Sequence, residues 1–171
     1  MAVHIRHERG EDHPAVAWVN ECAFGQPAEA NLVAALRKYG DQVISLVALQ
    51  DSRVAAHILF SPVTITKSDG SSCRAAGLGP VAVLSSLQKQ GIGSTLIRHG
   101  LNVCRERGYK AAIVLGHSSY YPRFGFAKST QFGIRWEHDA PEEAFMALEL
   151  VPGGLAGCAG VARYLPEFND V

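Results

Sequence analysis

Two short segments of this 171-residue chain combine residue types and spacings that could support chemistry. The first, Gln88-Lys89-Gln90-Gly91-Ile92-Gly93, stands where an apolar segment gives way to helical spacing. A helix N-terminus exposes about four N–H groups without internal partners and carries roughly half a positive charge. Glycines just before it let the backbone come close to a ligand. This junction is therefore predicted to bind a phosphate group.

Two well-known phosphate motifs do not fit this junction. The pattern G-x-x-x-x-G-K-[ST] is absent, and G-x-G-x-x-G fails because Leu96 stands at the position of its third glycine. A kinase or a dinucleotide-dependent oxidoreductase is therefore disfavoured. The alternative for Gly91 and Gly93 is that they only turn the chain.

The stretch before the junction, GLGPVAV, contains Pro80, which cannot donate a hydrogen bond to a sheet ladder. A bulge or a splayed strand would accommodate this proline and leave backbone groups of Val81 to Val83 open to a ligand that carries amides. An extended ligand with amides along one arm and a pyrophosphate at its end describes coenzyme A. The second segment, Tyr121-Pro122-Arg123-Phe124-Gly125-Phe126, follows the next apolar run.

The elements that must position these segments are read from apolar spacing. A first helix is predicted after Asp12, its cap, with Val16, Val19 and Ala23 on one face. Further helices are predicted at 27–40, with Leu32, Val33, Leu36 and Tyr39 as its apolar stripe, and at 92–108. Strands are predicted at 3–6, 43–50, 54–66, 73–83, 111–116, 129–136 and 145–150. The order is two helices, an antiparallel meander, a strand–helix–strand crossover and a closing hairpin. It predicts an α+β (mixed α/β) domain, and the tail 151–171 gives no clear pattern.

Composition limits the class of protein. Lys plus Arg and Asp plus Glu both total 16, so there is no basic field that would favour nucleic acid or a membrane surface. No apolar run approaches the roughly 18 residues of a membrane helix, and the first residues are too polar for a secretory signal. The four cysteines (Cys22, Cys73, Cys104 and Cys158) lie far apart, which argues against a zinc site or a disulfide framework and for a reducing compartment. A single cytoplasmic domain over 1–171 is expected.

Taken together, the two segments resemble the GNAT superfamily of acyl-CoA-dependent N-acyltransferases. The stretch 88–93 fits the family's [QR]-x-x-G-x-[GA] signature, and 121–126 fits its Y-x-x-[LF]-G-F segment. One predicted helix and one predicted strand lie between them, as in the family. The stretches AHILFSPV and GLGPVAV are also similar to those of a bacterial subgroup of predicted N-acetyltransferases. The resemblance covers a core of about 3–150 and leaves out the tail.

The resemblance implies a mostly antiparallel sheet splayed into a V and flanked by helices, with acetyl-CoA as the acyl-donor cosubstrate in the gap. It implies that the pantetheine arm is bound by the backbone of Val81, Ala82 and Val83. The pyrophosphate would be bound by the amides of Gln88, Lys89, Gln90, Gly91, Ile92, Gly93 and Ser94. The Tyr121 hydroxyl would be the general acid for the leaving thiolate. No metal is implied, the partner is a small-molecule or peptide amine, and homodimers are common in such families.

The general base is left open by the sequence. Many family members carry a Glu on the strand before the glycine turn, whereas AAGLGPVAV contains no carboxylate. His57, His117 and a chain of water molecules remain as alternatives. Glu29 and Arg37 are either residues of the acceptor pocket or part of a solvated helix face. Cys104 lies on an apolar helical stripe, which predicts a buried, inert thiol.

These observations predict an N-acetyltransferase in which the amine attacks the thioester directly. A strand amide near Val81 to Val83 would polarise the carbonyl, and Tyr121 would protonate the thiolate. The alternative is a non-catalytic acyl-CoA-binding or sensing module, which would need no Tyr121 hydroxyl. The identity of the acceptor is not determined by the sequence.

Overall fold

The computed structural model describes residues 2–171, which form two compact units. The first unit contains the chain up to Phe60, Gly79–Val103 and Pro166–Val171, and the second contains Ser61–Leu78 and Cys104–Leu165. Strands β3 (Arg53–Thr66) and β4 (Ser72–Val83) and helix α3 (Ile92–Glu106) contribute residues to both units. The expectation of one domain over 1–171 stays a prediction.

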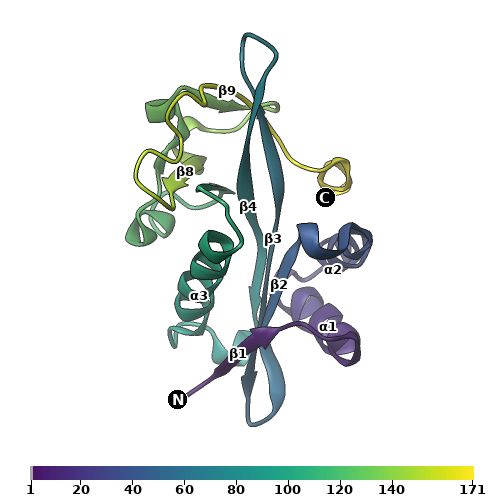
Figure 1. Cartoon of the computed structure of the whole chain (residues 1–171). Helices are drawn as coiled ribbons and strands as arrows, with labels where there is room; N and C mark the ends of the chain where they lie inside the picture. Colours follow the sequence, from purple (N-terminus) through teal and green to yellow (C-terminus); the bar gives the residue numbers. More distant parts are fainter. Residues whose placement is uncertain (1) are drawn as a thin grey trace. The chain divides into compact units, whose positions relative to one another are not determined.

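The first unit is built on an antiparallel ladder. Strand β1 (His4–His7) pairs with β2 (Ile44–Gln50), and β2 pairs with the first part of β3. Helices α1 (His13–Phe24) and α2 (Ala28–Leu36) pack side by side next to this ladder (Figure 1). Most of their predicted apolar stripes is buried, with Val16, Val19, Leu32, Val33 and Leu36 almost fully covered, whereas Ala23 and Tyr39 are half-buried.

Strand alternation gives β3 two different faces in this unit. His57 bonds to Asn20 of α1, whereas Phe60, three residues further along, contacts Gly100 of α3. Because successive side chains of a strand point to opposite faces, α1 and α3 contact opposite faces of β3.

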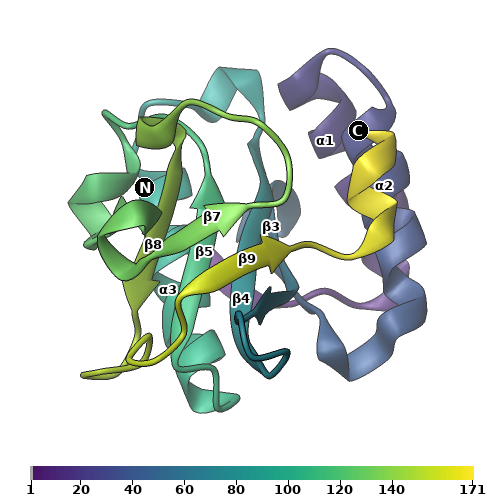
Figure 2. The same ribbon diagram turned by 90° about the horizontal axis from the view of Figure 1, so that it is seen from above.

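The second unit contains two groups of paired strands, which the hydrogen-bonded neighbours β3 and β4 join into one sheet. In one, β4 pairs in parallel with β5 (Ala111–Leu115), β5 pairs antiparallel with β8 (Phe145–Glu149), and β8 pairs antiparallel with β6 (Ala127–Lys128). In the other, β9 (Gly160–Arg163) pairs antiparallel with β3 and in parallel with β7 (Ile134–Trp136) (Figure 2). Their core contains Val63, Ile65, Ile113, Ile134 and Phe145.

Within residues 2–171 there are also seven short 3-10 segments: Gly10–Asp12, Arg37–Gln42, Ser85–Leu87, Tyr121–Phe124, Ser129–Phe132, Glu142–Ala144 and Pro166–Asp170. Most of the strand pairs are antiparallel, and the sheet is mixed. The predicted α+β class with a mixed, mostly antiparallel sheet is therefore confirmed. Among residues 2–171, no helix has both the length and the apolar character needed to cross a bilayer.

Three local predictions were wrong. The strand expected at 129–136 begins only at Ile134, because Ser129–Phe132 form a 3-10 turn that ends at Gly133 in a left-handed conformation. The second helix ends at Leu36 rather than at Gly40, and a 3-10 turn follows it. The Asp12 carboxylate does not cap α1. It accepts the Arg9 amide at 2.7 Å and pairs with the Arg6 guanidinium.

The tail is more ordered than its sequence indicated. After β9, the 3-10 segment Pro166–Asp170 lies along α2 (Figure 2). The Glu167 carboxylate accepts the Tyr39 hydroxyl at 2.9 Å and pairs with the Lys38 ammonium at 2.6 Å. The C-terminal segment is thus fastened to the residues that follow α2.

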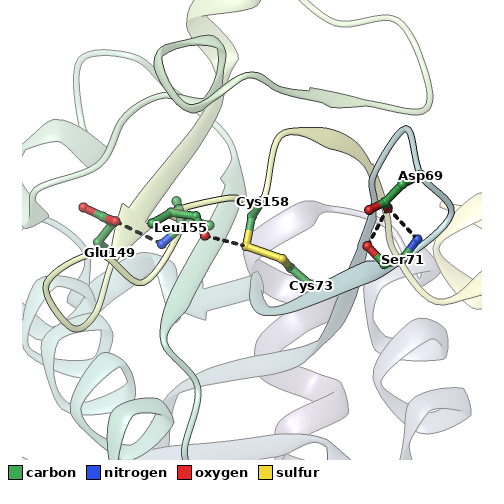
Figure 3. Close-up of a disulfide and its surroundings, with 7 residues drawn as sticks. Asp69, Ser71, Cys73, Glu149, Leu155 and Cys158 are labelled. Carbon is green, nitrogen blue, oxygen red and sulfur yellow. Dashed lines mark hydrogen bonds between the residues drawn. A yellow bond between two sulfur atoms is a disulfide. The ribbon is translucent and has the colours of Figure 1, made fainter.

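A disulfide joins Cys73 and Cys158 (Figure 3), with their Cα atoms 5.8 Å apart. The expectation of no disulfide was wrong, because a separation of 85 positions along the chain does not show whether the two cysteines meet. Cys73 lies near the start of β4, and Cys158 lies two residues before β9. Disulfides persist mainly in oxidising surroundings, so the cysteines no longer argue for a reducing compartment. Cytoplasmic localisation stays a prediction.

Candidate functional site

The predicted phosphate-binding turn is exposed and leads directly into α3. Lys89 and Gly91 both have positive φ angles, 63° and 85°, which reverse the chain before the helix. The Thr95 amide and hydroxyl both donate to the Gly91 carbonyl, at 3.0 and 2.9 Å, and close the first helical turn. Because α3 begins at Ile92, the amides of Ile92 and Gly93 have no intrahelical carbonyl partner. The turn can therefore offer N–H groups and the positive end of the helix dipole to an anion.

Two hydrogen bonds hold the end of β4, one to β3 and one to this turn. The Leu84 amide donates to the Ala55 carbonyl at 3.0 Å, and the Gln88 side chain donates to the Val83 carbonyl at 3.0 Å. The sequence had left the Val83 carbonyl to a ligand, whereas the structure uses at least one of its two lone pairs internally. Pro80 lies within β4, after a cis Gly79–Pro80 bond.

A glycine that the sequence analysis did not single out places α3 against the sheet. A Cβ on Gly100 would lie 2.8 Å from the Phe60 Cζ, and closer still to Cε2. The helix can therefore approach β3 only because position 100 has no side chain. The available signal was a glycine in the middle of an amphipathic helix, where glycine costs stability unless packing requires it.

Tyr121 begins the 3-10 segment that follows β5 in the second unit. Its ring is buried and meets those of Tyr120 and Phe126 edge to face, with centroid distances of 5.2 and 5.9 Å. A Cβ on Gly116 would lie 2.9 Å from the Tyr121 Cδ2 and would collide with Cε2. Gly116 thus leaves the space in which the ring sits. Burial, with a smaller effect of Tyr120, raises the pKa of Tyr121 to about 12.

His57, one of the two candidate bases, is the centre of a buried chain of hydrogen bonds in the first unit. The Asn20 side-chain amide donates to the Val16 carbonyl at 3.0 Å and lies 3.1 Å from His57 Nδ1, so Nδ1 accepts. Nε2 then carries the proton and donates to Ser45 Oγ at 2.8 Å. The Ser45 hydroxyl in turn donates to the Glu8 carboxylate at 2.8 Å.

Burial lowers the pKa of His57 to about 3, and the nearby charge of Arg37 contributes in the same direction. Both ring nitrogens are engaged, and the side chain is fully buried. A neutral imidazole with no nitrogen available to a substrate cannot act as a base. We therefore assign His57 to the packing of α1 on the sheet. His117 is exposed just beyond β5.

The other candidates for the acceptor pocket have internal partners. The Glu29 carboxylate accepts the Gln26 side chain at 3.0 Å, and Arg37 pairs with Glu8 at 2.9 Å. Cys104 is buried, and burial raises the pKa of its thiol to about 12, in agreement with the prediction of an inert thiol. Among residues 2–171 no cluster of His, Cys, Asp and Glu could hold a metal ion.

The structure thus brings most of the predicted donor-binding residues together. Val81, Ala82, Val83 and the turn Gln88–Ser94 are contiguous parts of the first unit. Tyr121 belongs to the second unit, where it is surrounded by aromatic rings and Gly116. The local geometry fits an anion at the turn and a neutral phenol at position 121.

Comparison with known proteins points to one family. A model described as an acetyltransferase (GNAT) domain matches residues 4–129. The chain is 33% identical over 166 residues to an uncharacterized N-acetyltransferase of Escherichia coli, YhbS, and the match covers 96% of this chain and 98% of that protein.

Two solved structures agree with this match over nearly the whole chain. The structure of YhbS from Escherichia coli in complex with CoA has a TM-score of 0.90 at 33% identity, covering 98% of this chain and 92% of that one. A GNAT family acetyltransferase from Brucella melitensis in complex with acetyl-CoA has a TM-score of 0.80 at 35% identity, covering 98% of both chains.

Proposed function

The chain belongs to the GNAT acetyltransferase family, and from this premise we propose that it transfers an acetyl group from acetyl-CoA to an amine. The observation that carries the proposal is the exposed glycine turn at the start of α3, which presents backbone amides to an anion. The solved relatives from Escherichia coli and Brucella melitensis, which contain CoA and acetyl-CoA, support the same ligand.

In this proposal the donor is bound mainly by backbone groups of the first unit. The amides from Gln88 to Ser94 bind the pyrophosphate, where the dipole of α3 favours negative charge. Backbone groups of Val81 to Val83 bind the amides of the pantetheine arm. Binding through the backbone makes the affinity depend on the conformation of the turn rather than on the charge of Lys89.

The proposed reaction is a direct transfer. The amine lone pair attacks the thioester carbonyl carbon, a strand amide near Val81 to Val83 stabilises the oxyanion, and the C–S bond breaks. Tyr121 gives its proton to the thiolate, and the nitrogen loses one proton to water. Because the pKa of Tyr121 is raised to about 12, its phenol keeps its proton at neutral pH and serves as a donor.

Replacing Tyr121 by Phe tests the proposed acid. The change keeps the ring and its packing and removes only the hydroxyl. We expect kcat to fall by about ten- to a thousandfold, near or below the low end of the roughly 10²–10⁴-fold range for proton transfer, while the Kd for acetyl-CoA stays the same. Thiol release with a panel of amines gives kcat, and calorimetry gives the Kd.

The outcome also separates catalysis from the alternative of an acyl-CoA-binding or sensing module. Acetyl-CoA binding without acetylation of any amine would favour the module. Wild-type turnover by the Phe variant would leave the acid unassigned.

The acceptor, which is a small-molecule or peptide amine in this proposal, is identified by the same panel. A homodimer is tested by light scattering.

A further inference from the structure

The Gln88 side chain links the two parts of the proposed donor site, both of which belong to the first unit. Its Nε2 group donates to the carbonyl of Val83, the last residue of β4, at 3.0 Å. A glutamine can donate to a carbonyl only through its amide nitrogen, so this bond fixes the orientation of the side chain. Gln88 is also the first residue of the turn whose backbone amides are proposed to bind the pyrophosphate. One residue thus connects the turn, through its backbone, to β4, through its side chain.

The connection between β4 and α3 satisfies several of its carbonyl groups with donors of its own. The Leu84 carbonyl accepts the Leu87 amide at 2.8 Å, and the Gly91 carbonyl accepts both the amide and the hydroxyl of Thr95. The backbone amides of residues 89–93, in contrast, donate to no carbonyl within residues 2–171. Free amides attract a phosphate group, whereas carbonyl oxygens repel it. The bond of Gln88 is therefore one of several internal bonds that leave amides, rather than carbonyls, to an anion.

Few buried contacts hold this connection in place. Among residues 84–91, Leu84 and Leu87 are half-buried and the others are exposed. Exposed segments with few packed side chains open locally at a small cost in free energy. The distance between the end of β4 and the amides of the turn therefore depends on the hydrogen bonds of the connection itself, and the bond of Gln88 spans that distance directly.

A ligand that binds both parts at once is sensitive to this distance. In the proposed function, acetyl-CoA contacts the end of β4 with its pantetheine arm and the turn with its pyrophosphate. The second contact is then intramolecular, and its strength depends on how well the spacing of the two protein parts matches the ligand. A ligand that contacts one part alone gains nothing from the correct spacing. The bond of Gln88 should therefore matter for the whole donor more than for either of its halves.

We propose that Gln88 is a positioning residue, whose side chain fixes the spacing between the end of β4 and the pyrophosphate turn. This inference rests on the proposed function, because it concerns the same donor site. The side chain acts through the Val83 carbonyl and the backbone of the turn, and this role requires no contact between the side chain and the ligand.

The test compares Gln88→Met with the wild type for three probes: CoA, S-acetylpantetheine for the strand part and ADP for the turn part. Methionine is nearly as long as glutamine but has no N–H group to donate. Loss of one neutral hydrogen bond predicts that the Kd for CoA, measured by calorimetry, rises about three- to tenfold. The Kd values for the two fragments, measured by ligand-observed NMR, should change less than about twofold. The melting temperature should stay the same, because position 88 is exposed.

A second variant separates the hydrogen bond from the glutamine itself. Gln88→Arg keeps N–H donors on a long side chain, so it should hold the ratio of the ADP Kd to the CoA Kd within about twofold of the wild-type ratio. The ratio is the readout because an added positive charge strengthens the binding of both phosphate ligands. Gln26→Met is the matched control, because Gln26 is an exposed glutamine of the same unit whose side chain bonds to Glu29. This control should leave all three Kd values unchanged.

Three results would overturn the proposal. An unchanged Kd for CoA in Gln88→Met would show that the bond does not position the donor. An equal loss of affinity for CoA and for one fragment would confine the effect of Gln88 to one part of the site. A ratio in Gln88→Arg as low as that in Gln88→Met would show that the N–H donor is not what matters.

These binding measurements need no turnover, so they are independent of the proposed transfer. If the wild-type protein binds CoA but acetylates no amine, the proposed function fails and the role of Gln88 is still decided by the three Kd values. If the wild-type protein does not bind CoA, both the proposed function and this inference are refuted.

Discussion

The buried His57 makes a quantitative prediction about acid stability. Its pKa is lowered to about 3 in the folded chain by burial, against about 6.5 for an ordinary histidine. Below pH 6.5 the unfolded chain binds a proton at this residue, whereas the folded chain does not do so until the pH approaches 3. Folding stability should therefore be lost as the pH falls through this window, and it is fully retained above pH 6.5.

The magnitude follows from the width of the window. Each pKa unit corresponds to about 1.4 kcal/mol, so the full difference corresponds to about 5 kcal/mol. Between pH 6.5 and pH 4.5 the loss due to His57 alone should be about 2 kcal/mol. This is a large share of the 5–15 kcal/mol that typically separates folded and unfolded states. The lowered pKa of Asp12 acts in the same direction but only at lower pH, because its ordinary value is 3.8.

The assay is urea unfolding of the wild type and of His57→Gln at four pH values from 7.5 to 4.5. At pH 7.5 the variant should be less stable by about 1–3 kcal/mol, because Asn20 and Ser45 lose their partner. At pH 4.5 this difference should vanish or reverse, so the two stability curves should converge or cross.

The control is His99→Gln, which changes an exposed histidine of α3 and should shift the curve little. Parallel curves for the wild type and His57→Gln between pH 6.5 and 4.5 would refute the reasoning. In that case, His57 would have the same pKa in the folded and unfolded chains, and the assignment of a buried, neutral imidazole to this residue would be incorrect.

Three further predictions concern the turn, the disulfide and a buried serine. Gly91→Val should weaken CoA binding at least about tenfold, roughly 1.4 kcal/mol, because a β-branched residue is strained at φ 85°. Calorimetry measures this loss, and unchanged affinity would remove the turn from the site. Cys73→Ser together with Cys158→Ser should cost about 4 kcal/mol of stability, since the disulfide closes a long loop, and added reductant should change only the wild type. Ser61 Oγ is buried with no hydrogen-bond partner among residues 2–171, so Ser61→Ala should keep or raise the melting temperature, whereas Ser45→Ala should lower it. A lower melting temperature for Ser61→Ala would show that its hydroxyl has a partner after all.

The sequence by itself determined the features that depend on neighbouring residues. Turn chemistry and apolar spacing are local, so the junction at Gly91, the helix that follows it and the buried strand 111–116 could be predicted closely. The two segments at 88–93 and 121–126 were also sufficient to indicate the family. The fold class followed because the order of helices and strands permits few arrangements.

Only the tertiary structure decided which distant residues meet. The Cys73–Cys158 disulfide depends on where β9 lies, and β9 pairs with β3, about a hundred positions away along the chain. The burial of His57 depends in the same way on α1 covering one face of β3. Such contacts leave no periodic signal in the sequence. The spacing of apolar residues indicates which face of an element is buried, but it does not indicate which other element covers that face.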